Sequence, residues 1–147
     1  MLLEDFFQED GITRNVLETG EIVTHIQLPE NSDDFIGSYQ KLRLREAWDF
    51  PEGGVAFSVG VSADGSVSTI NMASTGFESI PRKHKELIES LDKGPNWALE
   101  ADRLGAELKR AVRPVLNTWF PPAYRKKMAS VLARRAMEET SKRVTSG

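Results

Sequence analysis

The stretch VAFSVGVSADGSVSTINM, residues 55–72, decides how the fold of this chain is interpreted. Large apolar residues alternate with small ones in its first half, which is typical of a strand with one buried side. The apolar side consists of Val55, Phe57, Val59 and Val61. Ala63-Asp64-Gly65 indicates a turn, because glycine tolerates positive φ, and a second strand continues through Ile70 and Met72. The stretch therefore predicts two antiparallel strands.

Two further strands are predicted upstream from the same period of two. Residues 21–28 form the first, ended by Pro29, and residues 37–45 form the second. On the second strand three cations share one parity, opposite Leu42 and Leu44; they are Lys41, Arg43 and Arg45. Such cations are typical of an edge strand protected against aggregation. For Lys41 and Arg45 a second interpretation competes, a positive charge aimed at an anionic ligand or at a carboxylate such as Asp49.

After Gly76 the pattern becomes helical. We expect a first helix from Pro81 to about Lys93, a second from about Asn96 that Pro114 kinks or ends, and a third that begins at Pro121-Pro122. Apolar positions predicted to face inward in the second helix are Trp97, Leu104, Leu108, Val112 and Val115. The predicted buried face of the third consists of Tyr124, Met128, Val131, Leu132 and Met137, opposite Arg125, Lys126, Arg134 and Arg135. The tail from residue 141 should fray.

Strands that precede helices predict an α+β fold. We expect an antiparallel sheet of three to four strands followed by three helices packed on one face. With 147 residues, 39% hydrophobic and 28% charged, the chain is long enough to bury a core. The formal charge is −3, from 19 basic and 22 acidic residues, which favours neither nucleic acid nor an anionic membrane as a partner. No long apolar run or basic leader is present, so a cytoplasmic location is expected.

Signatures of catalysis and metal binding are missing from the sequence. The chain has no cysteine, which excludes disulfides, thiolate nucleophiles and thiolate-held clusters within it. Its two histidines, His25 and His84, form no H-x-x-x-H pair and are interpreted as bystanders, with His84 on an exposed helix face. The basic cluster 125–127 favours a solvated or docking face over a nucleic-acid site. We therefore predict no catalytic residue and no metal ligand.

A family resemblance rests on several motifs in order. SYQKLRLREAWDF (38–50), followed by GVAFSVGV (54–61) and the Asp-Gly turn, resembles the C-terminal domain of the FAD-binding subunit of molybdenum hydroxylases. This is the family of the carbon monoxide dehydrogenase medium subunit and xanthine dehydrogenase, in which a Tyr-x-Lys-x-x-x-Arg strand precedes an Asp and an apolar strand. The resemblance continues through TGFESIPRKHKELIESLDKG (75–94) and AYRKKMASVLARRAMEE (123–139).

Upstream, LEDFF (3–7) and ETGEIVTHIQLP (18–29) resemble the end of the preceding flavin domain. The resemblance therefore divides the chain into residues 1–34, a remnant of the FAD-binding domain with a linker, and residues 35–147, the C-terminal domain. It implies that Val23 lies against the isoalloxazine of FAD and Lys41 near its polar edge, where a cation stabilises reduced flavin. Arg45 and Asp49 would form a structural ion pair, with Arg43 on the exposed edge.

The family's pyrophosphate-binding glycine motifs have no counterpart in this sequence. We therefore expect that the chain alone does not hold FAD stably, and that the N-terminal FAD-binding region is a partner. The resemblance implies two further partners, a molybdopterin subunit and a [2Fe–2S] subunit that passes electrons to FAD. The alternative is a stand-alone α+β interaction module that has lost the cofactor site. A homodimer formed through the edge of the strand 21–28 is a further expectation.

Overall fold

The computed structural model describes residues 1–28, 30, 35–46, 48–62 and 66–146. Four strands carry the fold: β1 (Phe35–Leu42), β2 (Gly53–Val61), β3 (Val67–Thr75) and β4 (Arg82–Lys83). The helices are α1 (Lys85–Glu89), α2 (Ala101–Ala111) and α3 (Pro122–Ser146). Two short 3₁₀ helices, η1 (Leu3–Asp5) and η3 (Trp97–Glu100), precede β1 and α2. The order of strands and helices confirms the predicted α+β class.

The strands form one antiparallel sheet in the order β1-β2-β3-β4. The predicted pairing of the two strands in residues 55–72 is confirmed, with Phe57 opposite Met72 and Val59 opposite Ile70. The turn predicted at 63–65 lies outside the described residues. Strand β1 pairs with the other side of β2, so that Tyr39 is opposite Ala56 and Lys41 is opposite Gly54.

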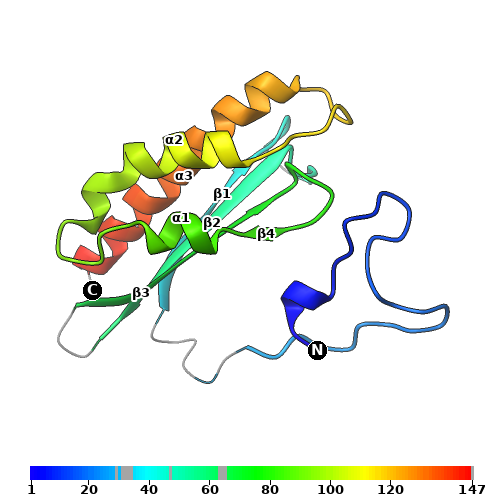
Figure 1. Ribbon diagram of the computed structural model, residues 1–147, viewed down its shortest axis with the longest axis horizontal. Coiled ribbons are helices and arrows are strands. Elements are labelled where there is room, and N and C mark those ends of the chain that lie inside the picture. The colour runs from blue at the N-terminus through cyan, green and yellow to red at the C-terminus, as the bar shows by residue number, and fades with distance from the viewer. Residues whose placement is uncertain (29, 31–34, 47, 63–65, 147) are drawn as a thin grey trace.

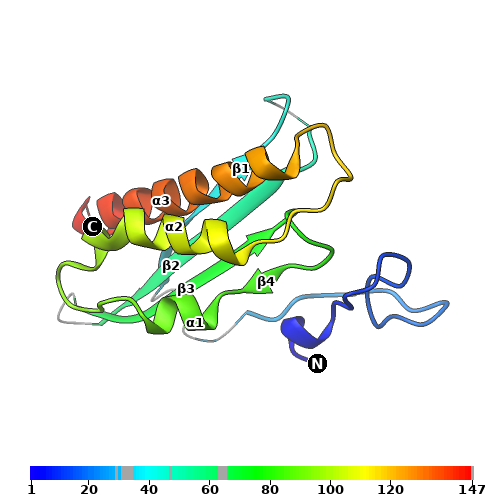
Figure 2. The same ribbon diagram turned by 45° about the horizontal axis from the view of Figure 1, so that its top comes forward.

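The core lies between the sheet and the helices, which cover one face (Figures 1 and 2). Strands β2 and β3 contribute large apolar side chains to it, and α3 adds Leu132 and Met137 together with small residues at three alanine positions, 129, 133 and 136. Small residues let a helix approach its neighbours closely. A glycine does this where α2 packs against α3. A Cβ atom at Gly105 of α2 would lie 2.7 Å from the backbone oxygen of Ser130 in α3. Gly105 therefore sets the spacing of the two helices.

The strand predicted for residues 21–28 is wrong, because this segment forms neither strand nor helix. Its apolar side chains are exposed. Within the described structure, therefore, neither pairing with a neighbouring strand nor burial in a core stabilises a strand here. The first helix also starts later than predicted. Residues Arg82 and Lys83 pair with Ser74 and Ala73 of β3, and α1 begins at Lys85. Pairing with the free edge of β3 therefore outweighs the local helix propensity of this segment, and residues 82–83 form a strand.

The third helix begins where predicted, with Leu132 and Met137 buried as expected, but its first turn presents the other face and the helix runs longer. Arg125 is fully buried and Tyr124 is exposed, the reverse of the prediction. The tail is helical to Ser146 instead of frayed, because Val144 packs against the core and Arg143 donates to the carbonyl of Gly37 at 2.8 Å. In the second helical region Val115 is exposed, because α2 ends at Ala111 before Pro114 is reached.

Candidate functional site

The sheet has a second face, which the three helices leave uncovered (Figure 1). Cross-strand rows define it: Tyr39, Ala56 and Ala73 form one row, and Lys41, Gly54 and Thr75 form the next. Apart from the long side chains of Tyr39 and Lys41 on the outer strand, these residues are small. The side chains of Tyr39 and Lys41 therefore extend from the outer strand over small residues of β2 and β3.

The ring of Tyr39 lies over Gly54. A Cβ atom at Gly54 would be 2.3 Å from the phenol oxygen and 2.7 Å from the ring carbon that carries it. The phenol oxygen lies 3.4 Å from the hydroxyl oxygen of Thr75, across the neighbouring row. Gly54 thus provides the space that lets Tyr39 lie flat across the strands, with its hydroxyl group pointing toward β3.

Lys41 is held by the loop that joins β1 to β2. Its ammonium donates to the carbonyl oxygen of Asp49 at 2.5 Å. Asp49 in turn fixes the loop, since its Oδ2 accepts from the backbone N–H groups of Leu44 and Arg45, both at 2.8 Å. The backbone hydrogen bond from Arg45 holds the pKa of the Asp49 carboxyl below its usual value, so the carboxylate stays charged. Lys41 is therefore placed by a preformed loop.

The predicted ion pair between Arg45 and Asp49 is confirmed, with Nη2 of Arg45 at 3.4 Å from Oδ1 of Asp49. Arg45 is largely exposed, so the pair orients the loop more than it stabilises the fold. Arg43 is exposed, but β1 ends at Leu42, so the strand predicted for residues 37–45 is too long and Arg43 does not lie on its edge as expected. The tip of the loop is strained at Trp48, which has φ of 51° and a fully exposed side chain.

Arg125 organises this end of the sheet and was missed in the sequence. Its Nε donates to the carbonyl of Glu52 at 2.9 Å, and Nη1 donates to the carbonyl of Val115 at 2.7 Å. Nη1 also reaches Oδ1 of Asn117 at 3.2 Å, and Nη2 donates to the carbonyl of Gly76. Burial lowers the pKa of Arg125 from its usual value, while the charge of Glu52 opposes that shift. One cation thus joins the ends of β2 and β3 to the loop before α3.

His84, predicted to be exposed, is buried. It lies directly before α1, and its Nε2 is 2.8 Å from the hydroxyl oxygen of Ser74 in β3. The prediction failed because it assumed a helix where the chain continues as β4. Burial lowers the pKa of His84; nearby Glu78 opposes the shift and Arg82 adds to it. His84 is a neutral, hydrogen-bonded part of the structure at neutral pH.

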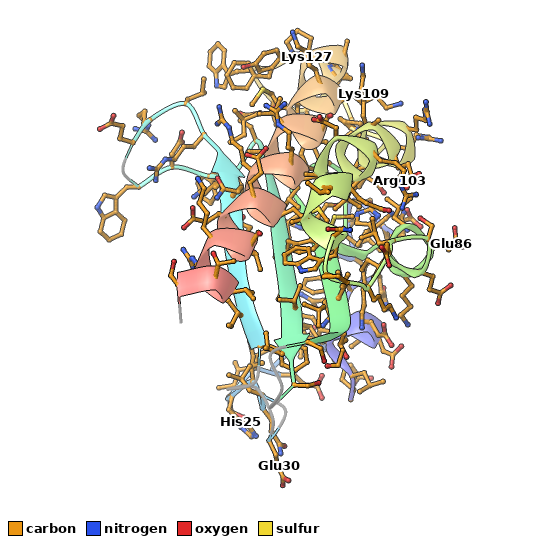
Figure 3. All side chains as sticks on the ribbon, turned by 90° about the vertical axis from the view of Figure 1, so that its left-hand side faces the viewer. His25, Glu30, Glu86, Arg103, Lys109 and Lys127 are labelled. Atoms are coloured by element: carbon orange, nitrogen blue, oxygen red, sulfur yellow. The ribbon has the colours of Figure 1, made fainter. Side chains whose placement is uncertain are left out.

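The N-terminal segment, residues 1–28, contacts the edge of the domain beside β4 and α1 (Figure 1). Glu4 pairs with Lys85 at 3.2 Å, and Glu9 pairs with Arg82. Val23 is 55% exposed. Figure 3 places His25, two residues after Val23, at the opposite end of the molecule from the C-terminal end of β1, where Lys41 lies. The structure therefore does not bring Val23 and Lys41 together, and a shared flavin site remains a prediction.

Metal and membrane sites are not found within the described part of the chain. The residues placed there contain no group of three or more His, Asp or Glu side chains able to hold a metal ion. No helix among them is long and apolar enough to span a bilayer. The fold and the site thus define an α+β domain with one helix-covered sheet face and one open face that is edged by a tyrosine and a lysine.

Solved structures share this fold, although no family model matches the sequence. Carbon monoxide dehydrogenase from Hydrogenophaga pseudoflava, in a form that lacks the Mo-pyranopterin moiety of the molybdenum cofactor, superposes with a TM-score of 0.79 at 19% identity. Reconstituted CO dehydrogenase from Oligotropha carboxidovorans gives a TM-score of 0.77 at 25% identity, and quinoline 2-oxidoreductase from Pseudomonas putida 86 gives 0.77 at 14%. Each match covers 95% of this chain and 47% of the other. The chain thus spans about half the length of the solved chains it matches.

Proposed function

We propose that this chain forms part of the FAD-binding subunit of a molybdenum hydroxylase and supplies one wall of the flavin site. The carrying observation is the open sheet face with Tyr39 and Lys41, in a fold shared with a chain of CO dehydrogenase that is about twice as long. The sequence motifs that resemble this family lie on the same elements. Residues 38–50 include most of β1 and nearly all of the loop that holds Lys41.

The open face fits a planar cofactor in three respects. The central residues of the face are small, the phenol ring of Tyr39 lies flat over Gly54, and Lys41 presents an ammonium with a fixed backbone partner. A bound flavin supplies reversible electron transfer. Lys41 would stabilise negative charge on the reduced ring, and Tyr39 would restrict how the ring stacks. Nothing in this arrangement makes or breaks a substrate bond, so the proposed role is that of an electron-transfer wall.

The exposed N-terminal segment supports the presence of a second part. Among the apolar residues exposed there are Ile12, Ile22, Val23, Ile26 and Leu28. Exposed apolar residues gathered in one segment are typical of a surface that another region covers. We propose that the N-terminal FAD-binding region covers it, and that this contact moves Val23 toward the flavin. The domain boundary near residue 34 belongs to the same proposal.

A spectrum combined with affinity purification tests the proposal. The purified chain, incubated with excess FAD and desalted, should stay colourless, because the diphosphate has no glycine motif to bind. The tagged chain, recovered from native cells, should carry flavin absorbance and bring molybdopterin and [2Fe–2S] subunits with it. A colourless chain without these partners would contradict the proposal and favour the stand-alone interaction module.

A further inference from the structure

An open hollow of about 710 Å³ lies at the end of the sheet, lined by the loop after β1 and the loop before α3. The first loop contributes Phe50 and Glu52 together with Leu44 and the Arg45–Asp49 pair, and the second contributes residues 116–119. Figure 3 shows Lys127, near the start of α3, at this same end of the molecule. The hollow is lined by other residues than the open sheet face.

Glu52 is the unexplained group in this hollow. Glu52 is buried, with an exposed fraction of 7%, yet its Oε2 has no hydrogen-bond partner within the described residues. The hydroxyl of Thr118, which also lines the hollow, is buried and unpartnered as well. A buried carboxylate oxygen without a donor costs free energy, and such groups are usually satisfied by a ligand, a partner or water.

The nearby cations do not satisfy Glu52. Arg125 gives its N–H groups to carbonyl and amide oxygens, among them the backbone oxygen of Glu52, and not to the Glu52 carboxylate. Arg45 is paired with Asp49, and Lys41 donates to the Asp49 carbonyl. Within the described residues, then, the carboxylate of Glu52 forms no ion pair, although the nearby charge of Arg125 partly offsets its own. Its free oxygen Oε2 still lacks a donor, and a cation from outside the chain would supply one.

The surroundings of the hollow indicate that this donor belongs to a protein. Trp119 is 85% exposed and Phe50 is 88% exposed, and Leu116 beside them is equally open. Exposed aromatic and aliphatic residues around a buried polar group are typical of a binding hot spot, in which an anchor side chain enters a pocket and its neighbours cover the rim. The aliphatic stem of an arginine or lysine fits against such rings, and an arginine can also stack on Trp119.

We propose that this hollow is a docking site for a partner protein, which inserts an arginine or lysine side chain between Phe50 and Trp119 toward Glu52. The charged end of that side chain donates hydrogen bonds to Oε2 of Glu52 and to the hydroxyl oxygen of Thr118. Apolar residues on either side of that cation in the partner cover Leu116 and the aromatic rim. The proposed contacts use none of the residues of the open sheet face, although the loop that holds Lys41 through Asp49 also lines the hollow.

The test uses the full chain and three probe peptides: acetyl-Leu-Arg-Leu-amide, its glutamine analogue and its glutamate analogue. Indole N–H signals in a ¹H–¹⁵N NMR spectrum report binding, because Trp119 lies at the hollow whereas Trp97 is buried in the core and serves as the internal control. The arginine peptide should shift the Trp119 signal in a saturable way and leave Trp97 unchanged. The glutamine and glutamate peptides should bind about tenfold more weakly or not at all.

Variants locate the effect, with peptide affinity measured by isothermal titration calorimetry, which does not depend on the Trp119 signal. Glu52→Gln should weaken binding of the arginine peptide by about tenfold or more. Trp119→Ala changes an exposed residue and should weaken binding without unfolding the chain, whereas Leu99→Ala, an equally exposed residue of η3, should not. Equal binding of the arginine and glutamine peptides, or an unchanged affinity in both Glu52→Gln and Trp119→Ala, would overturn the proposal. So would a concentration-dependent dimer that Trp119→Ala abolishes, because a second copy would then occupy the hollow.

Discussion

The guanidinium of Arg125 donates to the backbone oxygen of Glu52 at 2.9 Å, and these residues are 73 positions apart in the sequence. This contact links the start of α3 to the start of β2. The remaining N–H groups of Arg125 hold Val115, Asn117 and Gly76. Through these bonds the helical layer is attached to the end of the sheet at which the two loops of the proposed docking site meet.

Replacement of Arg125 should therefore destabilise the whole fold. We expect Arg125→Met to lower the free energy of unfolding by about 3–5 kcal/mol, because several buried carbonyl groups lose their donor. Urea denaturation followed by circular dichroism measures the change. The matched control is Lys127→Ala, an exposed residue of the same helix, which should stay within about 0.5 kcal/mol of the parent. A loss in Arg125→Met no larger than in the control would show that the buried network is not needed for stability.

Substitution of Gly105 in α2 and of Gly54 in β2 tests how closely neighbouring groups pack against each position. Gly105→Ala should cost about 1–3 kcal/mol despite the better helix propensity of alanine, because the new Cβ meets the backbone of Ser130. Gly54→Ala meets only the movable ring of Tyr39 and should cost less. Thermal unfolding of both variants ranks the two costs. The order would be reversed if the Tyr39 ring, and not the packing of α2 on α3, were the rigid element.

Much of the sheet could be predicted because its signals are local. The alternation at Val55, Phe57 and Val59 depends on the strand alone, and the Asp-Gly signal in the sequence favours the antiparallel pairing that the register shows. The segment at Arg82-Lys83 could not be predicted, because its strand form depends on the free edge of β3, which no local pattern indicates.

Arg125 shows the same limit within the candidate site. On a helical wheel it belongs to the polar face, and only the positions of four distant acceptors make its burial favourable. Lys41 was found because a family motif marks it, whereas Glu52 carries no motif and becomes notable only when its missing partner is seen in three dimensions. Arg125 and Glu52 could thus be recognised only from whether polar groups far apart in the sequence meet in the fold.

Stability should fall in mild acid because of His84. Its pKa is lowered in the folded state by burial, so the unfolded chain, in which histidine has a pKa of about 6.5, binds more protons. The free energy of unfolding should therefore decrease as the pH falls below about 6.5 and continue to decrease until the folded pKa is passed. Urea denaturation between about pH 7.5 and 5 measures this, in a His25→Gln background that leaves His84 as the one histidine. A second substitution, His84→Gln, should flatten the profile; an equal slope with and without His84 would contradict the assignment.

Lys41 gives the sharpest test of the proposed flavin wall. In the complete assembly we expect Lys41→Gln to lower the reduction potential of the flavin, because a cation that stabilises the negatively charged reduced ring is lost. A loss of about 1.4 kcal/mol corresponds to about 30 mV for a two-electron couple. Spectroelectrochemical titration of the purified complex measures the midpoint potential. Arg43→Gln is the matched control, because Arg43 is a neighbouring cation beyond the end of β1. A potential that is unchanged in Lys41→Gln, or shifted equally in Arg43→Gln, would mean that Lys41 only anchors the Asp49 loop and that its ammonium does not face the flavin.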